Sequence, residues 1–114
     1  MIARTFQLDA AQTAQVFDAA RRVLSSPHLV RFFSVPGEAE LELLDDGELL
    51  RIDRLVEADD AWWVLDFKWR VGASEREIYA RQVMRYREVV QSIHPERVVR
   101  AALVVADGEL IELD

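Results

Sequence analysis

The chain has 114 residues, which is the size of one domain. Its formal net charge of −7 argues against nonspecific affinity for nucleic acid. It contains no cysteine, which excludes disulfides, thiolate zinc sites and a cysteine-held Fe–S cluster. No apolar run approaches the ~20 residues that span a bilayer, and no secretory signal is evident, so a cytoplasmic location and no membrane partner are expected.

The first predicted element is a helix over residues 9–25, with Asp9 as its cap. Pro27 follows the helix directly, and residues 28–37 are expected to form a connection. Apolar residues repeat at helical spacing along one side of this helix, which predicts a core-facing stripe. The stripe contains Val16, Phe17, Ala20, Val23 and Leu24.

Three strands are predicted next, over residues 39–44, 48–56 and 62–68. The first alternates apolar and acidic residues, and the third is rich in aromatic and β-branched residues. Between the first two strands, Asp46-Gly47 is a strong signal for a type I′ hairpin turn.

A second helix is predicted over residues 75–92, opened by a capping box of Ser74 and Glu77. Two more strands are expected over residues 97–105 and 109–113. The order α-β-β-β-α-β-β predicts a mixed α/β (α+β) fold in which helices flank a central sheet.

The charges are unevenly distributed along the chain. Residues 38–60 carry ten acidic and two basic groups, whereas residues 68–100 carry eight basic and four acidic groups. Thirteen of the basic residues are arginine, and Lys68 is the only lysine. Because lysine and arginine differ in their chemistry, this single ammonium group marks a candidate functional position.

Strand register predicts that several carboxylates lie close together. A turn centred on Asp46-Gly47 sets Glu40 opposite Asp53, and a symmetric second turn sets Asp53 opposite Asp66. Alternation along the third strand adds Lys68 to the same face of the sheet. Like charges in adjacent strands repel, so this arrangement needs a compensating cation.

We therefore predict a Mg²⁺ site, with Mn²⁺ as a possible substitute, because hard divalent cations prefer oxygen ligands. Asp53 and Asp66 are the expected direct ligands, joined by the Phe67 carbonyl and, directly or through water, by Glu40. A charged Lys68 is expected to orient an attacking water at a phosphoryl group rather than to act as a neutral base. The alternative is that these acids occupy the solvent face of an amphipathic meander.

Three segments, LLRIDRLV, WWVLDFK and YARQVMRY, together resemble the nuclease domain of RecB/AddA-type (UvrD-like) helicase–nucleases, which belong to the PD-(D/E)XK superfamily. The resemblance covers about residues 28–113 and implies a restriction-endonuclease-like α-β-β-β-α-β core. It matches Asp53, Asp66 and Lys68 to the catalytic motifs and Glu40 to an acidic residue of the first strand.

The resemblance also matches Gln82 and Tyr86 to a Q-x-x-x-Y motif, preceded by Tyr79, which is a further candidate for a contact with DNA. It implies that Gln82 and Tyr86 face the metal site, where they contact the DNA backbone or order Lys68. The alternative for the two tyrosines is packing in the core along the apolar side of the helix. Arg81 and Arg85 are four residues apart and are candidates for phosphate contacts. A solvated helix surface, with Glu77 paired to Arg81, is an equally good interpretation of the two arginines.

The function implied by the resemblance is a Mg²⁺-dependent DNA exonuclease domain, active in double-strand break repair and recombination. The chain, 1–114, is then a single nuclease-like domain from the C-terminal part of a larger helicase–nuclease. Its partners would be DNA, in particular single-stranded DNA, together with the helicase domains of the parent chain and a partner subunit. The alternative function is a catalytically inactive nuclease-fold module that guides DNA or binds protein.

Overall fold

The structure is a computed structural model that describes residues 9–113. It contains three helices and five strands, and none of the helices in the described range is long and apolar enough to cross a membrane. The elements are α1 (Ala10–Ser25), α2 (Val30–Phe33), β1 (Gly37–Asp45), β2 (Glu48–Ala58), β3 (Ala61–Lys68), α3 (Ala73–Ile93), β4 (Val99–Val105) and β5 (Leu110–Leu113).

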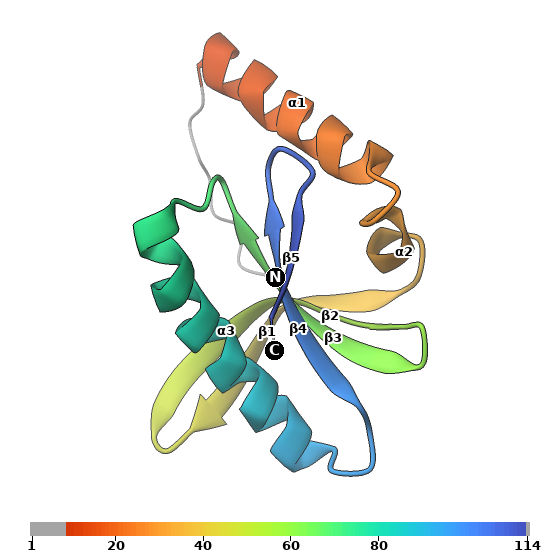
Figure 1. Ribbon diagram of the computed structural model, residues 1–114, viewed down its shortest axis with the longest axis vertical. Coiled ribbons are helices and arrows are strands. Elements are labelled where there is room, and N and C mark those ends of the chain that lie inside the picture. The colour runs from red at the N-terminus through yellow and green to blue at the C-terminus, as the bar shows by residue number, and fades with distance from the viewer. Residues whose placement is uncertain (1–8, 114) are drawn as a thin grey trace.

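The strands form one mixed sheet in the order β1-β2-β3-β4-β5. All neighbours are antiparallel except β3 and β4, which are parallel and are joined by α3. Parallel neighbours need a long crossover connection, and a helix is the usual one. The prediction of a mixed α/β fold with helices flanking a central sheet is confirmed (Figure 1).

Each face of the sheet has its own apolar core. On one face, α3 packs Val83 and Val90 against strand residues such as Val64 and Leu103. On the other face, Phe32 of α2 packs in a second cluster with strand residues, and its ring centroid lies 4.9 Å from that of Trp63. Successive side chains along β3 therefore point alternately toward α3 and toward α2.

The turns set the strand register as predicted. Asp46 and Gly47 both have positive φ angles, of 50° and 80°, as a type I′ turn requires. The resulting pairs, such as Leu43 with Leu50, follow the predicted register. The second connection is equally tight, and pairs such as Arg54 with Leu65 confirm that it is symmetric.

The start of α3 differs from the prediction. The helix begins at Ala73, directly after Gly72, so the capping box expected at Ser74 is wrong. Instead, the carboxylate of Glu75 folds back and its Oε1 accepts a hydrogen bond from the Gly72 backbone N–H at 3.2 Å. An acidic side chain in the first turn satisfies an N–H group that has no partner within the helix.

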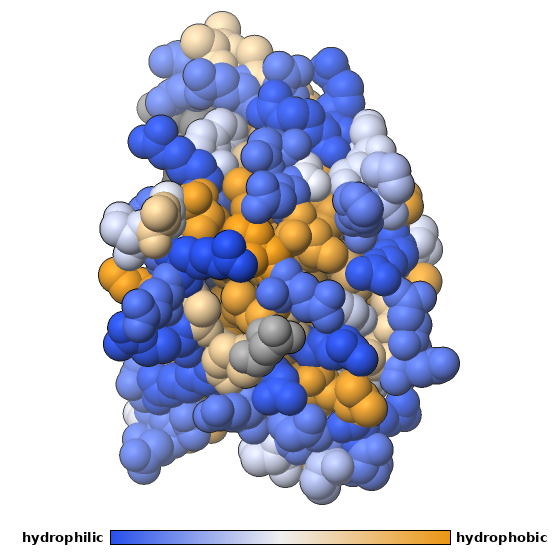
Figure 2. All heavy atoms as spheres, in the orientation of Figure 1, coloured by the Kyte–Doolittle hydropathy of each residue, from blue (hydrophilic) through white to orange (hydrophobic). Residues whose placement is uncertain are grey.

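Helix α1 has the predicted bounds, and Asp9 caps it as expected, but its stripe is not buried. The only buried residue of α1 is Ala19, which is not part of the stripe, while Phe17 of the stripe is 66% exposed. All residues of the stripe except Phe17 border an open groove beside the sheet, and apolar side chains are visible at the surface of this face (Figure 2). Residues 28–37 also differ from the expected connection, since they include the short helix α2.

These two phenylalanines give a test of the packing. Phe32 has 0% exposure, so Phe32→Ala is expected to lower the free energy of unfolding by about 3–5 kcal/mol. Phe17→Ala, which deletes an exposed ring of the same size, should change it by less than about 0.5 kcal/mol. Chemical denaturation of both variants checks the difference, and equal losses would show that α1 is packed more tightly than the structure indicates.

Candidate functional site

The acidic site lies where β2 and β3 stop pairing. The last pairs run as far as Arg54 with Leu65, and Asp53 and Asp66 follow immediately beyond them. There the Asp53 carboxylate takes the place of a backbone partner, since its Oδ2 accepts a hydrogen bond from the Phe67 N–H at 2.8 Å. This hydrogen bond holds the Asp53 side chain beside the end of β3 that carries Asp66 and Lys68.

Asp66 is the only polar or charged residue that is buried among residues 9–113, with 4% exposure. Its Oδ2 lies 2.8 Å from the Lys68 Nζ, which makes an ion pair. In the described part of the chain, this oxygen has no hydrogen-bond partner besides the ammonium group of Lys68. A buried carboxylate in this state is costly unless cations compensate it.

The charges of this site act on one another. Burial, and after it the neighbouring Asp66, raise the pKa of Asp53 from 3.8 to about 6, against the opposing effects of the Phe67 N–H and Lys68. For Lys68, burial alone would lower the pKa, but the contact with Asp66 and the charges of Asp66 and Asp53 outweigh it, so the net shift is upward. Lys68 is therefore a cation, as predicted.

Helix α3 contributes two side chains around this ammonium group. The Gln82 Oε1 lies 3.4 Å from the Lys68 Nζ, and the ring centroid of Tyr79 lies 4.4 Å from the same nitrogen. Gln82 is therefore in place to order Lys68. Tyr86 instead follows the alternative interpretation, because it packs in the core beneath α3 with 8% exposure and has little surface with which to contact DNA.

Glu40 is not assembled with the other acids. Within residues 9–113, no group of three or more Asp, Glu, His or Cys side chains is arranged to hold a metal ion, so Glu40 does not form a three-carboxylate site with Asp53 and Asp66. The backbone of Glu40 has a φ angle of 53°, which interrupts the regular alternation of β1. Its Oε2 is buried and has no hydrogen-bond partner among the residues that the structure describes.

The two arginines predicted to contact phosphates are paired with acids of the chain itself. Arg81 lies 3.0 Å from Glu77 on the solvent side of α3, as the alternative interpretation expected. Arg85 lies 3.2 Å from both Asp45 and Glu48, so it ties α3 to the hairpin of β1 and β2. The structure therefore directs neither guanidinium toward Asp66.

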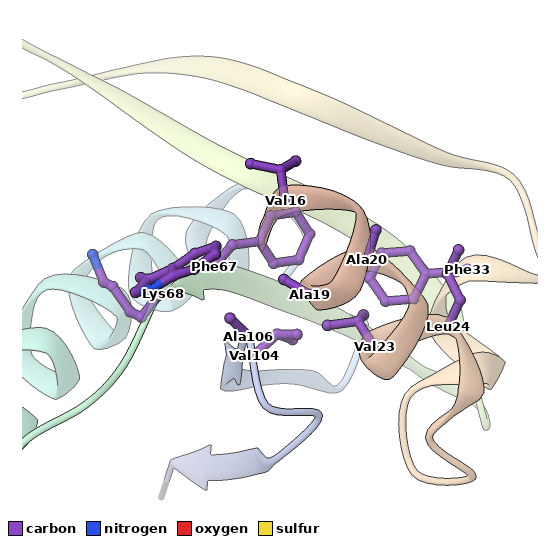
Figure 3. A pocket seen from close by; sticks show the side chains of 11 residues that line it. Val16, Ala19, Ala20, Val23, Leu24, Phe33, Phe67, Lys68, Val104 and Ala106 are labelled. Carbon is purple, nitrogen blue, oxygen red and sulfur yellow. The ribbon is translucent and has the colours of Figure 1, made fainter. Parts of the chain in front are cut away.

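A groove of about 520 Å³ lies between α1 and the ends of β3 and β4. Its walls are mostly apolar and include Phe33, Phe67 and Trp69, of which Trp69 is 56% exposed. Lys68 also borders the groove, while its nitrogen points away from the side chains of α1 (Figure 3). The groove and the acidic site are thus neighbours across the end of β3.

Comparison of the sequence with models of protein families and with curated proteins gives no match.

One residue of the site was not anticipated from the sequence. Glu75 accepts a hydrogen bond from the Tyr79 hydroxyl at 2.8 Å, and its signal is the i,i+4 spacing of a glutamate and a tyrosine on one helix.

Proposed function

We propose that the chain is a Mg²⁺-dependent DNA nuclease domain of the PD-(D/E)XK type, which hydrolyses phosphodiester bonds. The observation that carries this proposal is the placement of the only lysine 2.8 Å from a buried aspartate, with a second aspartate held at the same strand end. A packed structural core has no need for three charged groups in a site of this kind. Such clusters of perturbed charges are typical of catalytic sites.

The donor set suits a hard divalent cation. Asp53 and Asp66 supply two carboxylates, and among residues 9–113 the buried Oδ2 of Asp66 has no partner other than Lys68. With the Phe67 carbonyl and water molecules, these are the oxygen ligands that Mg²⁺ accepts. Bound Mg²⁺ stabilises charge on a phosphoryl oxygen and lowers the pKa of a water molecule.

The residues of the chain then have separate tasks. Lys68 orients the attacking water and offsets the negative charge that develops on the phosphoryl group, which is the role of a fixed cation in hydrolysis. Gln82 restrains Lys68 through the 3.4 Å contact of its side-chain oxygen. Asp66 fixes the other side of the ammonium group.

Single-stranded DNA is the substrate that the surroundings of the site favour. Phe67 and Trp69 are both exposed and border the groove that reaches Lys68. Unpaired bases stack on exposed aromatic rings regardless of sequence. The net charge of −7 also suits a domain that receives a strand from a basic partner rather than capturing DNA alone.

The resemblance to RecB/AddA-type proteins extends this proposal to a biological setting. The chain would be the nuclease part of a cytoplasmic helicase–exonuclease that acts in double-strand break repair and recombination. Helicase domains of the parent chain and a partner subunit would then deliver the DNA strand to Lys68.

One observation favours the alternative of a catalytically inactive module. In residues 9–113 the acids do not reach the three-carboxylate grouping expected with Glu40, and Lys68 already compensates Asp66. Calorimetry with Mg²⁺ or Mn²⁺ separates the two proposals. Binding that disappears in Asp66→Ala supports the nuclease, whereas no binding by the wild-type chain supports the inactive module.

The direct test is a hydrolysis assay on single- and double-stranded DNA, with and without Mg²⁺. The wild-type chain is expected to degrade single-stranded DNA only when Mg²⁺ is present, and Asp66→Ala should be inactive under all conditions. Circular dichroism of both proteins serves as the control for folding. Hydrolysis that proceeds equally in Asp66→Ala would refute the proposed site.

A further inference from the structure

We propose that Glu75 and Tyr79 form a positioning pair that fixes the Lys68 ammonium group beside Asp66. This inference rests on the proposed nuclease function for its catalytic meaning, but the contacts on which it depends can be measured without any activity. It gives Tyr79 a role other than the DNA contact suggested by sequence, and it adds Glu75 to the site.

Glu75 is held at both of its carboxylate oxygens. Its Oε1 accepts a hydrogen bond from the Gly72 N–H at 3.2 Å, and its Oε2 accepts one from the Tyr79 hydroxyl at 2.8 Å. One carboxylate therefore connects the first turn of α3 to the tyrosine one turn further along. Because two hydrogen bonds restrain it, Glu75 in turn restrains the phenol ring.

Tyr79 presents the face of its ring to Lys68. The ring centroid lies 4.4 Å from the Lys68 Nζ, which is within the range of a cation–π interaction. The hydroxyl points to Glu75 and is already used as a donor. Both the ring face and the hydroxyl are thus engaged within the protein, which indicates a positioning role rather than a contact with a phosphate.

Three groups then surround the ammonium of Lys68. Asp66 lies at 2.8 Å, the Gln82 oxygen at 3.4 Å and the Tyr79 ring at 4.4 Å. A lysine side chain has a flexible four-carbon stem, so several contacts are needed to hold its charge at one point. Without the ring, Asp66 and Gln82 alone would restrain the group.

The variants separate this role from that of the helix cap. Tyr79→Phe keeps the ring and the Gly72–Glu75 cap but removes the hydrogen bond that orients the ring. Glu75→Gln has one acceptor oxygen in place of two, so it loses either the Gly72 cap or the bond from Tyr79 and should show part of the effect of Tyr79→Phe. Glu77→Ala is the matched control, because Glu77 is an exposed glutamate of the same helix that pairs with Arg81.

The first measurement uses the fact that Lys68 is the only lysine. With ¹³C-labelled lysine, the full chain gives a single ε-methylene signal in NMR, which the ring current of Tyr79 should displace upfield. Tyr79→Phe should lose much of this displacement, Glu75→Gln should lose part of it, and the control Glu77→Ala should keep it. An unchanged signal in Tyr79→Phe and in Tyr79→Leu would refute the contact.

The second measurement is the rate of Mg²⁺-dependent hydrolysis of single-stranded DNA. Tyr79→Phe is expected to lower kcat by about tenfold with little change in KM, because it misplaces a group that acts in the transition state. A rise in KM at constant kcat would instead show that Tyr79 binds DNA, and would overturn the positioning role. A wild-type chain without hydrolytic activity would refute the nuclease proposal and the catalytic role of the pair, while the NMR comparison would still decide whether the contact exists.

Discussion

Replacing Lys68 by alanine is expected to lower the rate of Mg²⁺-dependent hydrolysis of single-stranded DNA by about 10²- to 10³-fold. The substitution removes the only lysine of the chain, whose Nζ lies 2.8 Å from the buried Asp66. No other basic group is paired with Asp66 in the described part of the chain, so no arginine is placed to replace it. Initial rates at saturating Mg²⁺ and DNA measure the effect.

Binding of Mg²⁺ should persist in Lys68→Ala, because the carboxylates remain and a competing positive charge is lost. Lys68→Arg is the matched control. It keeps a cation beside Asp66 but replaces a compact ammonium by a planar guanidinium, so it should retain the fold and recover only a small part of the rate. Full activity in Lys68→Ala would overturn the role assigned to this residue.

Much of the fold could be predicted because turn chemistry fixes register. Asp46 and Gly47 both adopt the positive φ angles that a two-residue hairpin needs, and the strand pairing follows from that position. The same reasoning predicted that Asp53 and Asp66 lie close together on neighbouring strands, and in the structure both lie directly beyond the last pair of β2 and β3. Local sequence was sufficient here, since the turns connect neighbouring strands directly.

The predictions that were wrong concern features that depend on tertiary packing. The stripe of α1 has helical spacing, but spacing does not specify a partner, and Phe17 is 66% exposed. The short helix α2 is stabilised by distant groups, since the Arg54 side chain donates to the Phe32 and Val35 carbonyls at 3.0 Å. A local pattern could not reveal these contacts.

The candidate site shows the same division. Asp53, Asp66 and Lys68 followed from strand alternation, whereas Glu40 was misplaced because its positive φ angle breaks that alternation. Gln82 and Tyr86 are four residues apart on α3, yet only the first reaches Lys68. Tyr86 lies deeper, in the core, because the helix crosses the sheet and moves away from the end of β3.

Asp53→Asn is expected to abolish Mg²⁺-dependent hydrolysis and at the same time to stabilise the metal-free chain at neutral pH. The pKa of Asp53 is raised to about 6 in the folded chain, from an ordinary value of 3.8. The folded state therefore binds a proton more strongly than the unfolded state does. The free energy of unfolding must then fall as the pH rises through this interval, and above about pH 6 the stabilising contribution is lost.

An asparagine keeps an oxygen that accepts the Phe67 N–H but carries no charge next to Asp66. Thermal unfolding of Asp53→Asn between about pH 4 and 7.5 should thus depend less on pH than that of the wild type. Mg²⁺ at pH 7 should raise the Tm of the wild type, because it binds the ionised carboxylates, and should have little effect on the variant. Asp18→Asn, at an exposed position of α1, controls for the loss of one negative charge. A variant that keeps the wild-type pH dependence would show that Asp53 is not the carboxylate whose raised pKa makes stability depend on pH. Higher stability together with lost activity is the result expected when a charge is retained for binding rather than for folding.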